Sequence, residues 1–224
     1  MRLFKKRARA PHRTSLRLRL IVARNRLFKK TMDAREFGLA VFDHDQKAAL
    51  AGFPRRLLPD EADFCRFGME VYKSERLYFD ALRFDWCVFL ALGDTAERTA
   101  VMSPYWKGMR EWLQGTAAPS VPDVRILTRG SVGEVKILAA EPEEDSWQRM
   151  TRRLGMYAEA REIRAKQGEG KNEPWQYSAP YVFTRLFCDL CGELDVAFHM
   201  GEYAAFSAYV IDQVKLIKSY RIVV

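Results

Sequence analysis

Residues 59–93, PDEADFCRFGMEVYKSERLYFDALRFDWCVFLALG, decide the fold because they predict a long α-helix. Pro59 and the acidic pair that follows it suit a first helical turn, where the helix dipole favours negative charge. The pattern fits either one helix up to Gly93 or two helices broken near Gly68 or Ser74. Apolar residues recur at the spacing of one helix face at Phe64, Phe67, Val71, Tyr78, Ala81, Leu82 and Phe89.

Helical patterns continue on both sides of this segment. Capping residues, proline and periodic apolar positions indicate where each helix begins and ends. The expected helices are short pieces within 31–50 with Thr31 as N-cap and Glu36 nearby, a short helix to Met102 capped by Asp94 or Thr95, a helix from Ser103-Pro104, a helix from Ser146, and two final helices at Tyr181–Leu190 and Glu202–Ser219.

One segment has a different pattern. In VRILTRGSVGEVKIL, residues 124–138, two short β-branched runs flank a glycine-containing connection, which predicts a β-hairpin. We therefore expect a mainly α fold of helical hairpins with one short β-hairpin and an extended basic N-terminal arm. The expected organisation is a basic arm at 1–30, a helical region at 31–118, a loop and β-hairpin at 119–142, and a helical-hairpin region at 143–224.

The first thirty residues differ from the rest of the chain in charge. They hold twelve of the 37 basic residues and none of the 29 acidic ones, so the remaining residues carry a formal net charge of −4. The sequence RLFKK occurs at 2–6 and again at 26–30, and LRLRL at 16–20 continues into a stretch up to Phe28 that fits a strand or a helix. The basic residues are Arg2, Lys5, Lys6, Arg7, Arg9, Arg13, Arg17, Arg19, Arg24, Arg26, Lys29 and Lys30.

A segment with this charge repels itself and buries too little apolar surface to fold alone, so we expect a polyanion to neutralise it. RNA phosphates attract such arms through counterion release, and anionic lipid attracts each nearby Lys or Arg by about 1 kcal/mol. Arg-rich, Ser-containing N-termini without acidic residues are also typical of mitochondrial presequences. The arm thus indicates RNA binding, a lipid surface or mitochondrial targeting, and targeting is compatible with RNA binding.

The last third of the chain contains a weak repeat. LGMYAEA at 154–160 and CGELDVA at 191–197 each place an Ala five residues after a Gly, which in a stacked helical hairpin would permit a turn and then close helix packing. With its flanks, YVFTRLFCDLCGELDVAFHM at 181–200 resembles the pentatricopeptide repeat family, through an aromatic start, a Leu-rich first helix, a Cys-Gly turn and an acidic-apolar second helix.

This resemblance covers residues 146–205. It implies stacked helical hairpins, which in that family bind single-stranded RNA along one face. Two copies are too few to read an RNA sequence, so no RNA-reading residues are assigned from the family. An ordinary α-helical domain with two Gly–Ala turns is the alternative.

The sequence gives little support for catalysis or a metal site. Cys188, Cys191 and His199 resemble part of a zinc site, but the other candidate ligands are distant in sequence, so both cysteines are expected to pack in a helical core. Asp43-His44-Asp45 could orient a base or hold a cation, but is expected to be a solvated turn. GSVGEVK at 130–136 lacks the spacing of a phosphate-binding loop. We therefore expect no enzyme activity, cofactor or small-molecule substrate.

These features predict a structural subunit of a large ribonucleoprotein, most specifically a mitochondrial ribosome. The arm would bind ribosomal RNA, and the helical body would bind neighbouring protein subunits. One alternative is an accessory subunit of a mitochondrial membrane complex, such as a respiratory or ATP synthase complex, whose arm lies on anionic lipid. Another is a small enzyme or metal protein with a targeting sequence.

Overall fold

The structure is a computed structural model that describes residues 20–24, 30–50, 68–120, 127–128, 135–136, 143–168, 174–192 and 196–224. Its mainly helical architecture confirms the predicted fold class. The helices are α2 (Ala34–Leu50), α4 (Met69–Leu92), α5 (Ala96–Leu113), α6 (Ser146–Gly168), α7 (Ala179–Leu190) and α8 (Val196–Lys218), with a 3-10 helix η1 (Pro174–Tyr177). The strands are β1 (Thr31–Asp33), β2 (Leu127–Thr128), β3 (Val135–Lys136) and β4 (Arg221–Val223).

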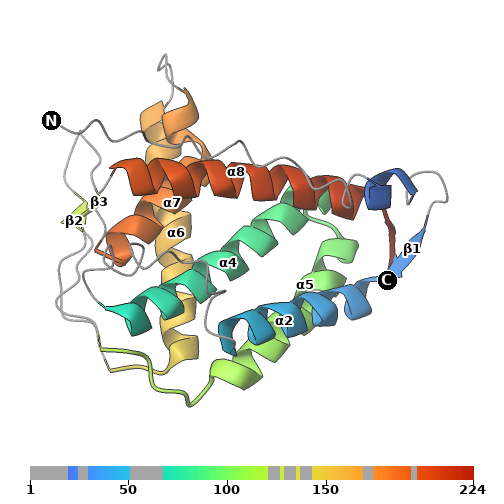
Figure 1. The fold of residues 1–224 in the computed structure, drawn as a ribbon, viewed down its shortest axis with the longest axis horizontal. Coiled ribbons are helices and arrows are strands. Elements are labelled where there is room, and N and C mark those ends of the chain that lie inside the picture. Colours follow the sequence, from blue (N-terminus) through green and yellow to red (C-terminus); the bar gives the residue numbers. More distant parts are fainter. Residues whose placement is uncertain are drawn as a thin grey trace, which may run out of the picture.

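Helix α4 crosses the middle of the helical body, with α8 on one side of it and α2 and α5 on the other (Figure 1). It supplies buried side chains to two hydrophobic clusters. Tyr78 and Phe84 belong to the first cluster, and Tyr72 and Phe79 belong to the second. Because both clusters need α4, the segment that dominates the sequence pattern is also the element around which the other helices pack.

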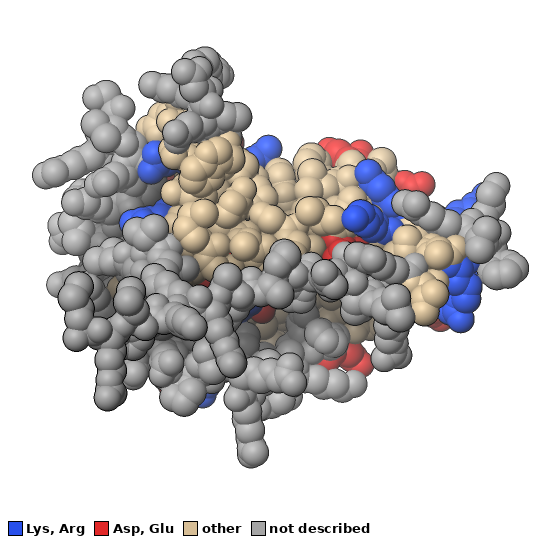
Figure 2. Space-filling model, turned by 45° about the horizontal axis from the view of Figure 1, so that its top comes forward, with Lys and Arg blue, Asp and Glu red and all other residues tan. Residues whose placement is uncertain are grey.

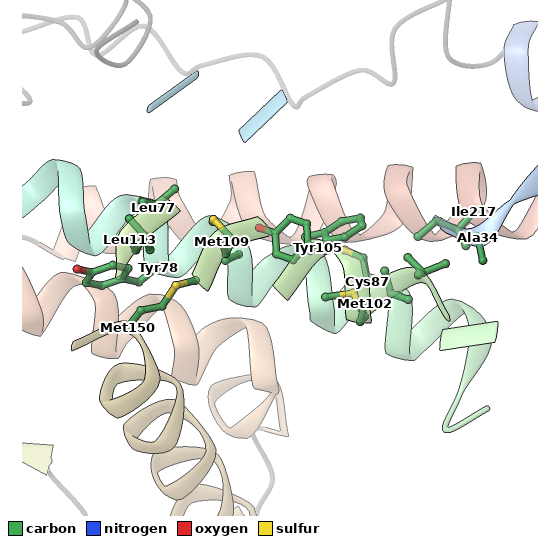
Figure 3. Close-up of a cluster of buried hydrophobic side chains, with 14 residues drawn as sticks. Ala34, Leu77, Tyr78, Cys87, Met102, Tyr105, Met109, Leu113, Met150 and Ile217 are labelled. Atoms are coloured by element: carbon green, nitrogen blue, oxygen red, sulfur yellow. The ribbon is translucent and has the colours of Figure 1, made fainter. Parts of the chain in front are cut away.

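The first cluster joins α4 to α5 and reaches α6 and α8. Figure 3 shows Tyr78 of α4 near Leu113 of α5 and Met150 of α6, with Ile217 of α8 at the other end of the cluster. All four side chains are 5% exposed or less. Burying side chains of this size contributes about 1.5–3 kcal/mol each relative to leaving them exposed.

The second cluster is aromatic and joins α4 to α6, α7 and α8. Phe79 stacks on Phe187 of α7 with ring centroids 4.6 Å apart, and it meets Phe206 of α8 edge-on at 5.4 Å. Such pairs stabilise a core by about 0.5–1.5 kcal/mol beyond the area that they bury. The first and last helical regions of the chain therefore share their interior.

A buried ion pair also joins α4 to α6, and the sequence pattern did not predict it. The Nε of Arg153 donates to Oε1 of Glu75 at 2.8 Å, and both side chains are fully buried. Two buried tyrosines lie near this pair. Burial, with the Glu75 charge as the next cause, raises the pKa of Tyr157 well above its ordinary value and that of Tyr78 to about 12.

Helices α2 and α5 pack closely through a glycine on each. A Cβ on Gly38 of α2 would lie 2.1 Å from the carbonyl oxygen of Val101 and 3.0 Å from Cγ of Pro104. A Cβ on Gly108 of α5 would lie 2.8 Å from the Phe42 ring of α2. Each glycine thus leaves room for the facing helix.

Several expected helix boundaries are confirmed. Helix α6 begins at Ser146 as predicted. Thr95 caps α5 by accepting from the backbone N–H of Arg98. Gly68, with φ +92°, precedes α4, so the break in the long apolar segment falls there and the helix continues through Ser74. The start predicted at Pro59 lies outside the described residues.

Other boundaries were wrong. Residues 96–113 form one helix and not two, because Pro104 is accommodated within α5. Thr31 is not an N-cap but lies in β1, and Asp33 caps α2 instead by accepting from the backbone N–H of Glu36 at 2.8 Å. Helix α6 runs through Gly155, where the repeat predicted a turn, whereas Gly192 does lie in a turn, with φ +74°.

The four strands form two small sheets. Strands β2 and β3 pair antiparallel, with Leu127 opposite Lys136, which confirms the short β-hairpin; the connection between them lies outside the described residues. Strands β1 and β4 pair parallel, with Thr31 opposite Arg221 and Asp33 opposite Val223. The sequence did not predict this second sheet.

Candidate nucleic-acid interface

The predicted interface was the basic arm, and the structure describes two of its twelve cationic residues. Arg24 lies in a helical segment at residues 20–24, and Lys30 directly precedes β1; both are exposed. This segment is helical where it is described, which answers the strand-or-helix question for five residues of the stretch 16–28. The other ten cationic residues of the arm lie outside the described residues.

The point where the arm joins the body, which we call the arm root (residues 30–33), is fixed to the end of the chain that follows α8. The backbone N–H of Arg221 donates to the carbonyl oxygen of Lys30 at 3.0 Å, and β1 and β4 continue this pairing. Ile222 packs against the first hydrophobic cluster, and Ala34, directly after β1, is 1% exposed. The position of the arm root on the body is therefore set by the fold.

Four more cations surround the arm root, and sequence reasoning missed them. Lys215 and Lys218 lie in the last turn of α8, Arg221 begins β4, and Arg35 lies in the first turn of α2; all four are exposed. Figure 2 shows Lys and Arg side chains at the right-hand end of the molecule, where Figure 1 places β1, β4 and the end of α8. The regular spacing of Lys215, Lys218 and Arg221 was the available signal, but the pairing with β1 is visible only in three dimensions.

These cations differ from most others in the described body. Nine other cationic side chains form ion pairs: Lys73, Arg76, Arg83, Arg98, Lys107, Arg149, Arg152, Arg153 and Arg185. Arg161 lies over the Trp86 ring, 4.6 Å from its centroid, and Arg164 donates to Gln167. In contrast, Arg24, Lys30, Arg35, Lys215, Lys218 and Arg221 form no ion pair with a described residue.

Acidic side chains lie at the same end. Asp33 and Glu36 are exposed, and Asp33 is engaged as the cap of α2. This end of the molecule therefore has more exposed cations than exposed carboxylates. A polyanion bound there would contact the cations and would have to avoid the carboxylates of Asp33 and Glu36. Long-range attraction of this kind is screened by salt beyond about 10 Å at 0.1 M ionic strength.

The cysteine and histidine candidates belong to the interior. Cys188 and Cys191 pack in the second hydrophobic cluster, as expected for core cysteines. His199 is 3% exposed, its ring lies 4.6 Å from that of Tyr181, and burial, with the Arg185 charge as the next cause, lowers its pKa. Within the described ranges, no three His, Cys, Asp or Glu side chains are grouped as a metal ion would require.

The acidic-histidine cluster was placed wrongly. Residues 43–45 were expected in a turn, but they lie within helix α2. A helix is favoured there because the segment packs along α5 through Gly38, and this tertiary contact overrides the local preference of Asp for turns.

Comparisons with protein-family models, with curated proteins and with solved structures found no match. Among the helices that the structure describes, none has the length and hydropathy needed to cross a bilayer.

Proposed function

We propose that this chain is a structural subunit of a large ribonucleoprotein and, more specifically, of a mitochondrial ribosome. In this proposal residues 1–30 bind ribosomal RNA. The observation that carries the proposal is the arm itself, with twelve cationic and no acidic residues ahead of a body with a net charge of −4. Eight of the twelve are arginines, whose planar guanidinium suits bidentate contact with phosphate. RNA binding would proceed through counterion release and would fall steeply with salt.

The proposed role of the body is to hold the arm and to contact neighbouring proteins. The buried clusters and the β1–β4 pairing support the first part, because they fix where the arm leaves the body. The outer face of α8 supports the second. Met200 is 38% exposed and Ile211 is 52% exposed, with Gly201 and Ala204 exposed on the same face, and Figure 2 shows an uncharged area in the middle of its view.

The test replaces all twelve arm cations with Gln in the full chain. The variant should no longer co-sediment with ribosomal particles, and its residual RNA binding should have a much lower log–log salt slope, because each phosphate contact contributes about 0.7–0.9 to that slope. The matched control changes the eight arm arginines to Lys, which keeps the charge. It should retain most of the salt dependence.

Two outcomes would overturn the proposal. If the Gln variant assembles as the native chain does, the arm does not bind RNA in the particle. If nuclease digestion leaves the native protein associated with a sedimenting membrane complex, the arm serves a lipid surface and not ribosomal RNA.

A further inference from the structure

We propose that Lys30, Arg35, Lys215, Lys218 and Arg221, here called the root patch, form a second RNA-binding surface that contacts phosphates beside the arm. Three of these residues come from the opposite end of the sequence, so the patch exists only once the chain has folded. The inference rests on the proposed function and extends it, because it assigns RNA contacts to the folded body.

Cations without an ion-pair partner among the described residues are concentrated at this end of the body. Outside the root patch and Arg24, the cations whose side chains the structure describes and that form neither an ion pair nor another interaction named above are Arg110 and Lys166. A body that satisfies most of its cations internally but leaves five together at one end has a local excess of positive charge there. Such an excess attracts a polyanion over distances comparable with the Debye length.

Folding alone does not favour this arrangement of cations. Arg35 lies in the first turn of α2, where the helix dipole disfavours a cation. The backbone N–H of Arg221 donates to the carbonyl oxygen of Lys30, so folding brings two cationic residues onto adjacent chain segments, and neither forms an ion pair with a described residue. Lys215 and Lys218 do suit the last turn of α8, so the dipole accounts for them but not for the other three. Phosphate neutralisation accounts for all five.

The root patch also lies directly beside the point where the arm joins the body. The parallel register aligns Thr31 with Arg221, so the patch begins where the arm ends, and RNA bound by the arm passes next to it. The arm would bring twelve cations to the RNA, and the patch would fix its location relative to the body. Side chains on a packed helix and a paired strand hold a fixed position on the body, which setting that location requires.

RNA fits the patch better than an anionic membrane does. The exposed carboxylates of Asp33 and Glu36 lie among the cations. A lipid surface would present negative charge to all of them at once, and the acidic side chains would be repelled. An RNA backbone is a narrow track of phosphates that can follow the cations and leave the carboxylates facing solvent.

The experiment compares two full-length variants, each of which replaces one Lys and one Arg by Gln. Lys218→Gln with Arg221→Gln removes two cations from the root patch, and Arg110→Gln with Lys166→Gln removes one Lys and one Arg elsewhere. Binding to a folded ribosomal RNA fragment is measured over a salt series. The patch variant should lose about 1–2 from the log–log salt slope and bind about tenfold or more weakly at 0.1 M salt, and the control should change by much less.

Arg35→Gln provides a second readout that a folding defect would not reproduce. The variant should weaken RNA binding while thermal stability stays the same or rises slightly, because it removes a cation from the positive end of α2. A fall in both quantities would overturn the assignment of Arg35 to the patch.

The remaining outcomes separate the patch from the arm. If the patch and control variants change RNA binding equally, the root patch is not an RNA site, whatever the arm does. If a variant with the eleven arm cations other than Lys30 changed to Gln binds RNA normally but loses binding when Lys218 and Arg221 are also changed, the arm proposal fails and the patch stands. If the patch variant loses binding to vesicles of phosphatidylcholine and cardiolipin but not to RNA, the ligand is lipid and the inference is wrong.

Discussion

Replacing Gly by Ala at Gly38 and at Gly155 tests the helix packing, because the two substitutions should change the stability of the fold in opposite directions. Replacing a helical Gly by Ala normally stabilises a protein by about 0.5–1 kcal/mol, because Gly loses more backbone entropy on folding. Gly38 of α2 faces α5, whereas Gly155 of α6 is exposed and has nothing within 4 Å of the position that a Cβ would occupy. We expect Gly155→Ala to stabilise the fold and Gly38→Ala to destabilise it.

The magnitude follows from the distances. A Cβ on Gly38 would lie 2.1 Å from the Val101 carbonyl oxygen, and ordinary contact begins at 3.4 Å, so α2 would have to move by about 1.3 Å. The obstacle is backbone, so a change of rotamer cannot relieve it. Overpacking of this kind costs about 1–3 kcal/mol, which exceeds the entropic gain. The net loss should be about 1–2 kcal/mol, against a gain of up to about 1 kcal/mol for Gly155→Ala.

Urea denaturation followed by circular dichroism measures both variants, and thermal unfolding provides a second value. For a chain of this size, each kcal/mol corresponds to about 2–4 °C in Tm. The m-value should stay unchanged, since neither variant alters the surface exposed on unfolding. If Gly38→Ala is as stable as Gly155→Ala, or more stable, the close approach of α2 to α5 is wrong.

Three further predictions concern buried ionisable groups. Arg153→Met should destabilise the fold by about 3–5 kcal/mol, because it leaves the Glu75 charge buried without the Arg153 cation. Adding Glu75→Leu should recover most of that loss in denaturation experiments. A double variant as unstable as the single one would contradict the coupling. Burial, and next the Arg185 charge, lowers the pKa of His199, so this side chain binds a proton more readily in the unfolded chain than in the folded one. The stability of the fold should therefore decrease as the pH drops below about 6.5. His199→Phe should weaken this dependence of stability on pH. Burial raises the pKa of the Cys87 thiol to about 12, so iodoacetamide at pH 8 should label Cys87 rapidly only after unfolding, as peptide mass spectrometry would show; fast labelling of the native protein would refute its burial.

Local sequence patterns predicted the helices well where the apolar residues also form the core. Tyr78 and Ala81 lie on the predicted face of α4 and are buried, and Ser146 begins α6 as expected. The patterns failed where packing overrides a local signal. Pro104 was expected to begin a helix, but it lies inside α5 at the contact with Gly38, and Gly155 was expected in a turn but lies on the exposed side of α6.

The candidate site was predictable only in part. The arm is visible in the sequence because twelve cations fall within its thirty residues and no acidic residue lies among them. The root patch is not visible in that way, because Lys30 and Arg221 become neighbours through a strand pair between distant segments. Three-residue strands carry too weak a periodic signal to predict such a pairing.

The β1–β4 pair also has a consequence for the order of events during synthesis. Thr31 and Arg221 are 190 residues apart, so at the usual rate of translation about 10–40 s pass between the two strands. During that interval the cationic arm is already made, but the strand that anchors its root does not yet exist. If the arm binds RNA as proposed, a nascent chain therefore meets RNA before its arm root has paired with β4.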